Sequence, residues 1–513
     1  MENAELRKHL RTDLFNDRLV SPSEAASLIR DGMTVALSGF TPSGTPKAIP
    51  AALAEQVRSG SRSLKISLLS GASTGEEVDS SWADLGIIAR RLPYMTSKPL
   101  RTAINKKPEA AVCYLDQHLG AVAQNARYGF YGSIDLAVIE AAAITEEGHI
   151  IPSTAVGCTQ TFVDLADKVL IELNLTQPVE LEGFHDIVRL QDPPERKPVP
   201  LTSVNGRIGV PYISCTPEKI AAVVITENHE NPRPLASPDE TSKRIAGHII
   251  DFLMTEKSAG RLSADRVPLQ SGVGSVANAV LLGLQDSPLD HLSFFSEVIQ
   301  DGIIALIDSG KADTASATSL TMSEAGMQHF LGNLEKYRGK VILRDSEVSN
   351  NAEVIRRLGV ISINTAIEAD IYGNINSSHM FGTDIYNGIG GSGDYTRNAS
   401  VSVFITPSTA KGGKISSIVP MVSHVDHTEH DVDVLVTEEG YADLRGLSPK
   451  ERAQLIIQNC AHPLYRPLLS SYFRQACEEC DYSQTPHLLG ECFSFHTRYK
   501  QTGTMLPDRK DDE

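Results

Sequence analysis

Residues 34–53 read TVALSGFTPSGTPKAIPAAL, and residues 268–284 read PLQSGVGSVANAVLLGL. In both stretches a short apolar run is followed by a glycine-containing turn and then by apolar residues at helical spacing. A strand that leads through a turn into a helix is the unit from which helix-covered parallel sheets are built. The two stretches therefore predict an α/β protein with two structurally similar halves.

Further apolar runs extend this pattern along both halves of the chain. Each is short and bounded by turn residues, which is typical of a buried strand. The predicted strands span residues 34–37, 65–69, 136–139, 168–171, 293–299, 341–343, 401–405, 415–419 and 432–436, with a helix expected at 48–57. The alternation of strands and helices favours parallel sheets over an all-β arrangement.

The length of the chain and its proline-rich segments predict the domain organisation. With 513 residues the chain is longer than one ordinary hydrophobic core accommodates. Residues 228–234 (NHENPRP) separate a strand-like run from a helical stretch, so we predict two domains, residues 1–230 and 231–513. Residues 191–200 (QDPPERKPVP) predict a loop, because prolines this dense fit neither a helix nor a central strand.

The charge balance and hydropathy limit the kinds of partner. The chain has 64 Asp and Glu against 47 Lys and Arg, a net charge of −17 at pH 7. Phosphate backbones need clustered basic residues, so we expect no nucleic-acid partner. The N-terminal residues contain no apolar signal-peptide core, and no run approaches the roughly 18–20 apolar residues of a membrane span. We expect a soluble, cytoplasmic protein that does not enter a membrane.

Cysteine and histidine spacings raise the question of a metal. Cys477 and Cys480 have CxxC spacing, but no second pair faces them, so we expect reduced thiols on a C-terminal helix. His424, His427 and His430 have acidic residues between them, and zinc would accept such ligands. The segment lies between two predicted strands without a clear outside ligand. We therefore expect these histidines to form hydrogen bonds near a site, and we expect no metal.

Residues 272–280 (GVGSVANAV) form a glycine turn that runs into a predicted helix. Helix N-termini present unpaired amides that bind anions, and glycine lets a ligand approach the backbone closely. Tight packing of the strand against the helix explains the same pattern without a ligand. A dinucleotide site is disfavoured because no acidic strand end follows at the required spacing.

Residues 291–302 read HLSFFSEVIQDG. The alternation of a strand places Phe295 and Glu297 on one face and Phe294 and Ser296 on the other. A carboxylate beside aromatic residues, just before a predicted Asp-Gly turn, lies where α/β sheets bind their ligands. Carboxylates act as covalent nucleophiles when they are desolvated and well placed. An ordinary paired or solvated glutamate is the alternative.

Residues 387–398 (NGIGGSGDYTRN) are the most glycine-dense stretch of the chain. Their amides could form an anion nest or an oxyanion hole, with a flexible surface loop as the alternative. The stretch lacks the Gly-Lys-Ser/Thr ending of a P-loop, which disfavours a nucleoside triphosphatase. Asn350 and Asn351, after a polar run, could supply a side-chain amide donor. No Gly-x-Ser-x-Gly elbow occurs, so a serine hydrolase is disfavoured.

Taken together, these stretches resemble the acetyl-CoA hydrolase/transferase family, and within it most closely the CoA-transferases of the succinyl-CoA:acetate type. The likeness covers nearly the whole chain and includes residues 134–157 (IDLAVIEAAAITEEGHIIPSTAVG), 182–187 (EGFHDI) and 419–453. The resemblance implies two similar open α/β domains with the active site between them, in a homodimer. It implies acyl-CoA and small carboxylates as substrates, with no metal and no cofactor beyond CoA itself.

The resemblance also implies roles for individual residues. Glu297 resembles the glutamate that becomes a glutamyl-CoA thioester, while Asn350 and Gly391 resemble the side-chain and backbone donors that stabilise its oxyanion. Glu438 resembles a second acidic residue near the site. The implied CoA-contacting set is Gly272, Val273, Gly274, Ser275, Val276, Asn387, Gly391 and Lys411. Residues 226–233 depart from the family pattern, so Arg233 is only a candidate contact for the acceptor carboxylate.

The implied reaction is ping-pong transfer of CoA from succinyl-CoA to acetate through glutamyl-CoA. An acetyl-CoA hydrolase that uses water at the same site is one alternative, and a non-catalytic CoA-binding sensor is another. A metal-dependent enzyme built on His424–His430 is a third. The exchanged acids stay open, because acceptor size depends on pocket walls that the sequence does not place.

Overall fold

The computed structural model describes residues 2–106, 111–230, 237–263 and 266–507. The chain forms two compact units. Unit 1 comprises Met1–Leu235, Ser293–Leu358 and Asn387–Asp394, and unit 2 comprises Ala236–Leu292, Gly359–Tyr386 and Tyr395–Glu513. Because the units interleave along the chain, residues 293–358 belong with the N-terminal residues. The predicted domain boundary between residues 230 and 231 adjoins residues 231–236, which lie outside the described ranges, so it stays a prediction.

Strands and helices alternate through unit 1, as the apolar runs predict. Its N-terminal part contains α1 (Glu2–His9), α2 (Pro22–Ala26), β1 (Thr34–Leu37), α3 (Ala48–Arg58), β2 (Ile66–Leu69), α4 (Ser81–Asp84), β3 (Ile88–Leu92), α5 (Lys98–Lys106), β4 (Cys113–Tyr114), η4 (Leu119–Ala121), α6 (Val122–Arg127), β5 (Leu136–Ile144), β6 (Ile150–Pro152), α7 (Thr159–Leu165), β7 (Lys168–Asn174), β8 (His185–Asp186) and β9 (Ile220–Thr226). Its later part contains β11 (Leu292–Phe295), β12 (Val298–Ile299), α10 (Asp301–Asp308), β13 (Ala312–Ala317), β14 (Ser319–Leu320), α11 (Glu324–Leu331), α12 (Leu334–Tyr337), β15 (Val341–Arg344), α13 (Ser346–Ser349), α14 (Ala352–Leu358) and the start of α15 (Ser392–Thr396).

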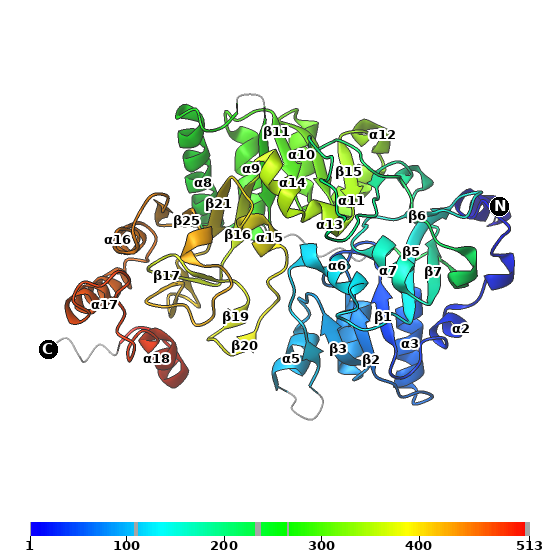
Figure 1. Ribbon diagram of the computed structural model, residues 1–513, viewed down its shortest axis with the longest axis horizontal. Coiled ribbons are helices and arrows are strands. Elements are labelled where there is room, and N and C mark those ends of the chain that lie inside the picture. Colours follow the sequence, from blue (N-terminus) through cyan, green and yellow to red (C-terminus); the bar gives the residue numbers. More distant parts are fainter. Residues whose placement is uncertain (1, 107–110, 231–236, 264–265, 508–513) are drawn as a thin grey trace. The chain divides into compact units, whose positions relative to one another are not determined.

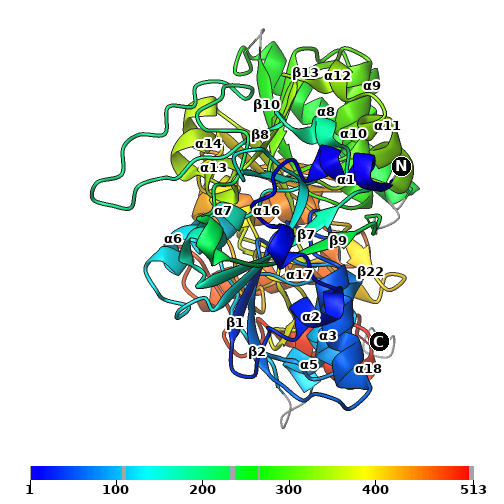
Figure 2. The same ribbon diagram turned by 90° about the vertical axis from the view of Figure 1, so that its right-hand side faces the viewer.

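A mostly parallel sheet lies at the centre of unit 1, with the strand order β4-β3-β2-β1-β5-β7-β9. Every pair along this path is parallel, and β6 pairs with β5 in the antiparallel direction. All residues of β5 are buried, as expected for a central strand of a parallel sheet. The helices α2 and α3 pack side by side next to this sheet (Figures 1 and 2). The α/β class expected from the sequence is confirmed.

The start of α3 lies in a buried cluster of charged groups. The carboxylate of Glu172, on β7, accepts hydrogen bonds from the backbone nitrogens of Lys47 (2.8 Å), Ala48 (3.0 Å) and Ile49 (2.5 Å). The Nζ atom of Lys47 donates to Glu140, on β5, at 2.6 Å. Ion pairing of this kind allows a strand as buried as β5 to contain a glutamate.

A second group of strands in unit 1 carries the segment around Glu297. Along it, β11, β13, β15 and β8 follow one another in hydrogen-bonded order. The sequence predicted one strand at residues 293–299, and this is wrong: β11 ends at Phe295, and β12 pairs with β14 instead. The strand is interrupted because the carbonyl oxygen of Glu297 accepts from the backbone nitrogens of Thr318 (3.0 Å) and Ser319 (3.2 Å). Phe294 and Phe295 are both fully buried.

The predicted Asp-Gly turn after this segment is also wrong. Asp301 and Gly302 open the helix α10, with Gln300 as its N-cap residue. An acidic residue in the first turn is favourable because it faces the positive end of the helix dipole. Residues 191–200, by contrast, contain neither helix nor strand, which confirms the loop expected from their prolines.

Unit 2 contains a mostly parallel sheet and a helical C-terminal region. Its elements are α8 (Glu240–Ser258), β10 (Val267–Ser271), α9 (Ser275–Asp286), β16 (Ile361–Thr365), β17 (Glu368–Asp370), β18 (Ile375–Asn376), β19 (His379–Met380), β20 (Asp384–Ile385), β21 (Val401–Ile405), β22 (Thr409–Ala410), β23 (Ile415–Ser416), β24 (Ile418–Val419), β25 (Val434–Thr437), β26 (Gly440–Asp443), α16 (Pro449–Asn459), α17 (Arg466–Glu479) and α18 (Ser494–Thr502). The strands β10, β16, β21, β25 and β26 follow in hydrogen-bonded order, with only the last pair antiparallel. The helices α8 and α9 pack on each other (Figure 1).

The strand predicted at residues 415–419 is divided in two, so that prediction is also wrong. β23 pairs with β22, whereas β24 pairs with β17. A buried cluster of aliphatic and aromatic side chains joins β24 and β25 to α16 and α17 and includes Tyr372, Tyr465 and Phe473. Within the part of the chain that the structure describes, no helix combines the length and apolar character that crossing a membrane requires.

Candidate active site

The carboxyl group of Glu297 lies in unit 1 where the chain leaves one strand and enters another. Ser296 and Glu297 fill the gap between β11 and β12, and both are fixed through their backbones. The nitrogen of Ser296 donates to the oxygen of Ser316 at 3.0 Å, and the oxygen of Glu297 accepts the two bonds described above. The backbone of Glu297 is therefore rigidly held, while its side chain stays available for other contacts.

Asn350 brings an amide donor to this carboxyl group. It is buried and caps the C-terminal end of the short helix α13. Its Nδ2 atom donates to Oε1 of Glu297 at 2.8 Å, and its Oδ1 atom accepts from Oγ of Ser349 at 2.9 Å. Both ends of the carboxamide are thus engaged, which fixes the amino group toward the carboxylate.

The glycine-rich segment Asn387–Asp394 belongs to the same unit. The carboxylate of Asp116 accepts from the nitrogen of Ile389 at 2.9 Å, and the oxygen of Gly390 accepts from the nitrogen of Leu119 at 3.3 Å. A Cβ atom at Gly388 would lie 2.4 Å from Oδ1 of Asp116, so only glycine fits there. The segment is therefore an anchored loop rather than the flexible one left open by the sequence.

Gly391 makes the closest approach of this loop to Glu297. A Cβ atom at position 391 would lie 1.9 Å from Oε1 of Glu297 and 2.3 Å from Nδ2 of Asn350. The backbone of Gly391 is therefore directly beside the carboxyl group. The three residues predicted to form the reacting group and its two donors come together, although they are separated by 53 and 41 positions in the chain.

Asp394 is a member of this group that the sequence did not indicate. Its Oδ2 atom accepts from Nδ2 of Asn350 at 3.1 Å and from the backbone nitrogen of Gly120 at 2.9 Å. One amino group, that of Asn350, thus bridges two carboxylates. The available signal was an acidic residue three positions after the predicted backbone donor, inside a glycine-rich stretch.

The electrostatics of the two carboxyl groups follow from their surroundings. Desolvation raises the pKa of Glu297 to about 7, and the hydrogen bond from Asn350 opposes this rise. Desolvation also raises the pKa of Asp394 to about 7, helped by the charge of Glu297 and opposed by the donors Gly120 and Asn350. Burial thus raises the pKa of both carboxyl groups above the ordinary value, and carboxyl groups perturbed in this way are common at functional sites.

An apolar cluster adjoins this group in unit 1. It consists of buried Phe40, Ala72, Leu119, Ala155 and Val298, with Tyr94 packed against it. Val298 follows Glu297 directly, and Leu119 is the residue whose nitrogen holds the glycine loop. Such surroundings keep water from the neighbouring carboxyl group.

The remaining predicted site residues have different neighbours. Asn387 opens the glycine loop of unit 1, and its Nδ2 atom donates to the oxygen of Gly388 at 2.8 Å. The others lie in unit 2, where Gly272, Val273 and Gly274 connect β10 to α9, and Ser275 and Val276 begin that helix.

Lys411 and Glu438, also in unit 2, have their own partners. The Nζ atom of Lys411 donates to the hydroxyl of Tyr499 at 2.6 Å. The carboxylate of buried Glu438 accepts from the backbone nitrogen (2.8 Å) and the hydroxyl (2.6 Å) of Ser408. The roles predicted for these unit 2 residues stay predictions, and Arg233 lies outside the described residues.

Residues 424–430, which contain His424, His427 and His430, also belong to unit 2. A metal site was the alternative interpretation of this segment. The ring of His424 packs on that of His379, with 3.8 Å between centroids, and its Nε2 atom is 3.3 Å from Oδ1 of Asp426. In the described ranges no group of three or more His, Cys, Asp or Glu side chains is arranged to hold a metal ion. That the protein uses no metal stays a prediction. Cys477 lies in α17, and Cys480 is the C-cap residue directly after it; neither forms a disulfide.

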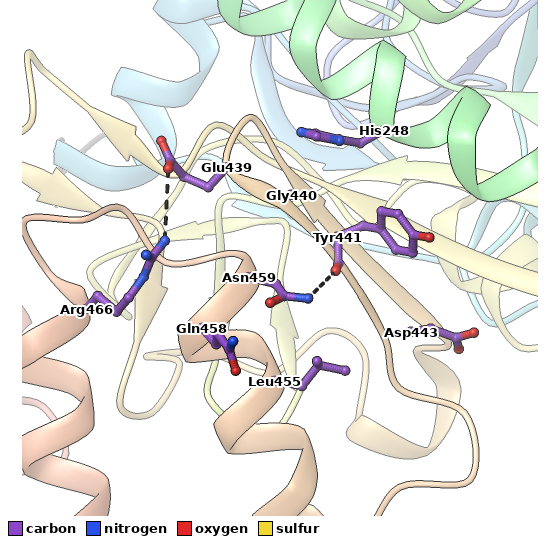
Figure 3. Close-up of a pocket in the computed structure, with 9 residues that line it drawn as sticks. All are labelled: His248, Glu439, Gly440, Tyr441, Asp443, Leu455, Gln458, Asn459 and Arg466. Atoms are coloured by element: carbon purple, nitrogen blue, oxygen red, sulfur yellow. Dashed lines mark hydrogen bonds and ion pairs between the residues drawn. The ribbon is translucent and has the colours of Figure 1, made fainter.

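A cavity of about 790 Å³ in unit 2 is lined by residues of α8, β26, α16 and the start of α17 (Figure 3). Arg466 is 4.0 Å from Glu439 across it, and Nδ2 of Asn459 donates to the oxygen of Tyr441 at 3.0 Å. Its lining includes His248 but none of the predicted site residues. The Glu297 group is therefore the arrangement in the described residues that best matches the chemistry expected from the sequence.

Comparison with known proteins identifies the family. Residues 1–225 match the acetyl-CoA hydrolase/transferase N-terminal domain, and residues 326–473 match the acetyl-CoA hydrolase/transferase C-terminal domain. The chain is 50% identical over 498 residues to a succinyl-CoA:acetate CoA-transferase of Clostridium kluyveri, covering 97% of this chain and 92% of that one. It is 43% identical over 491 residues to a propanoyl-CoA:succinate CoA transferase of Escherichia coli, covering 95% and 98%.

Other relatives are named differently. An acetyl-CoA hydrolase of Saccharomyces cerevisiae is 41% identical over 520 residues, covering 98% of each chain. Among solved structures, RipA from Yersinia pestis superposes with a TM-score of 0.71 at 23% identity, covering 92% of this chain and 99% of that one. A 4-hydroxybutyrate CoA-transferase from Porphyromonas gingivalis gives a TM-score of 0.62 at 20% identity, covering 90% and 99%. At these identities the two structures show a shared fold.

The two domain matches together cover more than half of the chain, and the relatives align along nearly all of it. The resemblance inferred from the sequence motifs is therefore confirmed. The chain belongs to the acetyl-CoA hydrolase/transferase family, whose members are enzymes that act on acyl-CoA and carboxylate substrates.

Proposed function

We propose that the protein is a CoA-transferase that moves CoA from succinyl-CoA to acetate, giving acetyl-CoA and succinate. The observation that carries this proposal is the amide of Asn350, 2.8 Å from Oε1 of Glu297 and beside Gly391. A carboxylate with a donor already at one oxygen is prepared for a reaction in which its own carbonyl carbon becomes tetrahedral. The identity of 50% to the Clostridium kluyveri enzyme supports the choice of acids.

The first half-reaction begins with attack of the Glu297 carboxylate on the thioester carbonyl of succinyl-CoA. The new C–O bond forms as the C–S bond breaks, giving a succinyl-glutamyl anhydride and CoA thiolate. The thiolate then attacks the glutamyl carbonyl carbon and expels succinate. The product is a glutamyl-CoA thioester, and no proton has to be moved.

The second half-reaction repeats these steps in reverse with acetate. Acetate attacks glutamyl-CoA to give an acetyl-glutamyl anhydride, and the released thiolate attacks the acetyl carbonyl. Acetyl-CoA leaves and the Glu297 carboxylate is restored. One thioester is exchanged for another, so the balanced reaction needs no nucleotide hydrolysis.

The neighbours of Glu297 match the demands of these steps. Each attack on the glutamyl carbonyl places negative charge on a former carboxylate oxygen, next to the N–H donor of Asn350. A single oxyanion donor contributes about 2.7–4 kcal/mol to such a transition state. The apolar cluster that includes Val298 and Leu119 limits the access of water, which would otherwise hydrolyse the thioester.

The remaining parts of the proposal rest on the family. We expect Gly272–Val276, Asn387, Gly391 and Lys411 to contact CoA, and Glu438 to lie near the reacting groups. We also expect a cytoplasmic homodimer.

Hydrolysis of acetyl-CoA is the second candidate function, because the yeast relatives are named acetyl-CoA hydrolases. The two activities differ only in whether a carboxylate or water opens glutamyl-CoA. The deciding experiment incubates the purified protein with succinyl-CoA, with and without acetate, and follows acetyl-CoA and free CoA by chromatography. Acetate-dependent acetyl-CoA that is lost in Glu297→Ala supports the transferase. Equal release of free CoA without acetate supports the hydrolase.

A further inference from the structure

The carboxamide of Asn350 is held at three points within unit 1. Each of its two N–H groups has one acceptor, Oε1 of Glu297 at 2.8 Å and Oδ2 of Asp394 at 3.1 Å. Its oxygen accepts from the hydroxyl of Ser349 at 2.9 Å. Rotating the carboxamide by half a turn would place its oxygen against two carboxylates. The acidic pair therefore selects the orientation in which Asn350 donates to Glu297.

The two acceptors differ in what happens to them during the proposed reaction. Glu297 becomes first an anhydride and then a thioester, so it loses its negative charge and most of its strength as an acceptor. Asp394 takes no part in bond making and stays an acceptor throughout. The donor of Asn350 must nevertheless keep its orientation in the glutamyl-CoA state, because the next oxyanion forms at that carbonyl.

Asp394 is itself fixed by the backbone. Its Oδ2 atom, the one that accepts from Asn350, also accepts from the nitrogen of Gly120 at 2.9 Å. The backbone of Gly120 lies close to both residues: a Cβ atom there would be 2.6 Å from the backbone oxygen of Asn350 and 2.9 Å from Oδ1 of Asp394. Asp394 therefore connects η4 to the carboxamide through a single oxygen atom.

We propose that Asp394 is a positioning residue, which holds the carboxamide of Asn350 with its donor toward Glu297 while Glu297 changes its chemical state. This inference rests on the proposed function, since it assigns Asp394 a part in the same reaction. It separates two properties of Asp394, its role as a hydrogen-bond acceptor and its negative charge, and different variants test each of them.

Asp394→Asn tests the charge. The amide oxygen of an asparagine can take the place of Oδ2 and accept from both Gly120 and Asn350, so the geometry is retained. Without the neighbouring negative charge, Glu297 ionises more easily. We expect an exchange rate within about threefold of wild type at the optimum, and an acid limb of the pH profile displaced to lower pH by on the order of one unit.

Asp394→Ala tests the acceptor. It leaves Asn350 without the partner that opposes rotation, so we expect kcat for exchange to fall by about 10–100-fold, with KM for succinyl-CoA nearly unchanged. Rescue of kcat in Asp394→Asn is the signature of positioning, because loss of packing alone would affect both variants. Asp116→Asn is the matched control: it alters another acid that binds a backbone amide of the same segment, through Ile389. The acid limb of its pH profile should lie at the same pH as that of wild type.

A second measurement does not depend on turnover. A pH titration by infrared difference spectroscopy, wild type against Glu297→Gln, isolates the carboxylate band of Glu297. The same difference taken in the Asp394→Asn background should have a lower midpoint. The positioning role is overturned if Asp394→Ala exchanges CoA as fast as Asp394→Asn. A midpoint that does not move overturns the effect assigned to the charge of Asp394.

The failure of the proposed function is distinguishable from these results. If wild type shows no acetate-dependent exchange, the transferase proposal falls and the positioning role falls with it. If wild type exchanges CoA but the Asp394 variants behave alike, only the positioning role is lost. A folded state of each variant is checked by its thermal unfolding midpoint, and Asp394→Asn, close in shape to wild type, covers the case in which Asp394→Ala does not fold.

Discussion

Gly391 lies so close to Glu297 that a Cβ atom at position 391 would be 1.9 Å from Oε1. This contact brings the backbone of Gly391 and the carboxyl group of Glu297 together without an intervening side chain. It also makes position 391 a sensitive probe of the site, because the added methyl group would meet Glu297 and Asn350 before anything else.

We therefore predict that Gly391→Ala lowers kcat for CoA exchange by at least about 100-fold, because Glu297 must move to make room. The fold should be retained, as judged by the thermal unfolding midpoint. The control is Gly247→Ala in α8, where a Cβ atom meets nothing within 4 Å. That variant should keep its activity and gain about 0.5–1 kcal/mol of stability, since alanine favours a helix. Full activity in Gly391→Ala would contradict the close approach.

Asn350→Ala should lower kcat by about 10²–10³-fold with little change in KM, because it removes a donor that acts on the developing oxyanion. Steady-state rates with succinyl-CoA and acetate measure this. The neighbouring Asn351 is a matched control, since its Oδ1 atom accepts from the nitrogens of Glu353 and Val354 at the start of α14. Asn351→Ala should cost about 1 kcal/mol of stability and leave kcat alone. Equal rates for the two variants would remove Asn350 from the mechanism.

The raised pKa of Glu297 predicts how stability depends on pH. In the unfolded chain this carboxyl titrates near its ordinary value of 4.5, and in the folded protein at about 7. The folded state therefore binds more protons between these values, and the contribution of Glu297 to stability decreases as pH rises from about 4.5 to 7. Glutamine has no such dependence.

We compare the free energy of unfolding of Glu297→Gln with that of wild type at two pH values. Between pH 4.5 and pH 8 this difference should shift in favour of the variant by about 1–3 kcal/mol. Urea unfolding at both pH values gives the comparison. Glu324→Gln, at an exposed position in the first turn of α11, should lose no more than about 1 kcal/mol at pH 8, the opposite direction, because only the interaction of its charge with the helix dipole is removed. A stability difference for Glu297→Gln that does not change with pH would mean that Glu297 ionises normally.

The buried cluster at the start of α3 predicts a large loss of stability. Lys47→Met leaves its two ion-pair partners, Glu140 and Glu230, without their cation, which should cost about 3–5 kcal/mol. The measurement is the thermal unfolding midpoint. Adding Glu140→Gln to Lys47→Met should restore part of the lost stability. Lys243→Met breaks an exposed pair with Glu240 instead and should cost less than about 1 kcal/mol. Equal effects of the two single changes would contradict the burial of Lys47.

The strands were the most predictable part of the fold. β1 and β21 coincide with the mostly apolar runs at residues 34–37 and 401–405, because strands buried on both faces are rich in apolar side chains. The break at Ser296 was not predictable. Apolar residues lie on both sides of Ser296 and Glu297, and the bonds from Thr318 and Ser319, distant in sequence, redirect the chain at Glu297.

The site was predictable where its residues lie in recognisable stretches. Glu297, Asn350 and Gly391 were identified from their motifs and from the family resemblance. Asp394 was missed because an aspartate in a glycine-rich loop is common in any protein. Its importance depends on contacts with Asn350 and Gly120, which come from two other segments of the chain. Such a relationship is a property of the folded backbone and leaves no local pattern.

The three amides that Glu172 occupies at the start of α3 make the two similar strand–turn–helix stretches unequal. A phosphate approaching α3 would have to displace a carboxylate already tethered to β7. The helix α9 begins differently, since its N-cap residue, Gly274, has no side chain with which to cap it. Two stretches with the same strand–turn–helix architecture can thus differ in their capacity to bind an anion. The N-terminal end of α3 is occupied by the protein's own Glu172, whereas α9 has no acidic residue at its N-cap position.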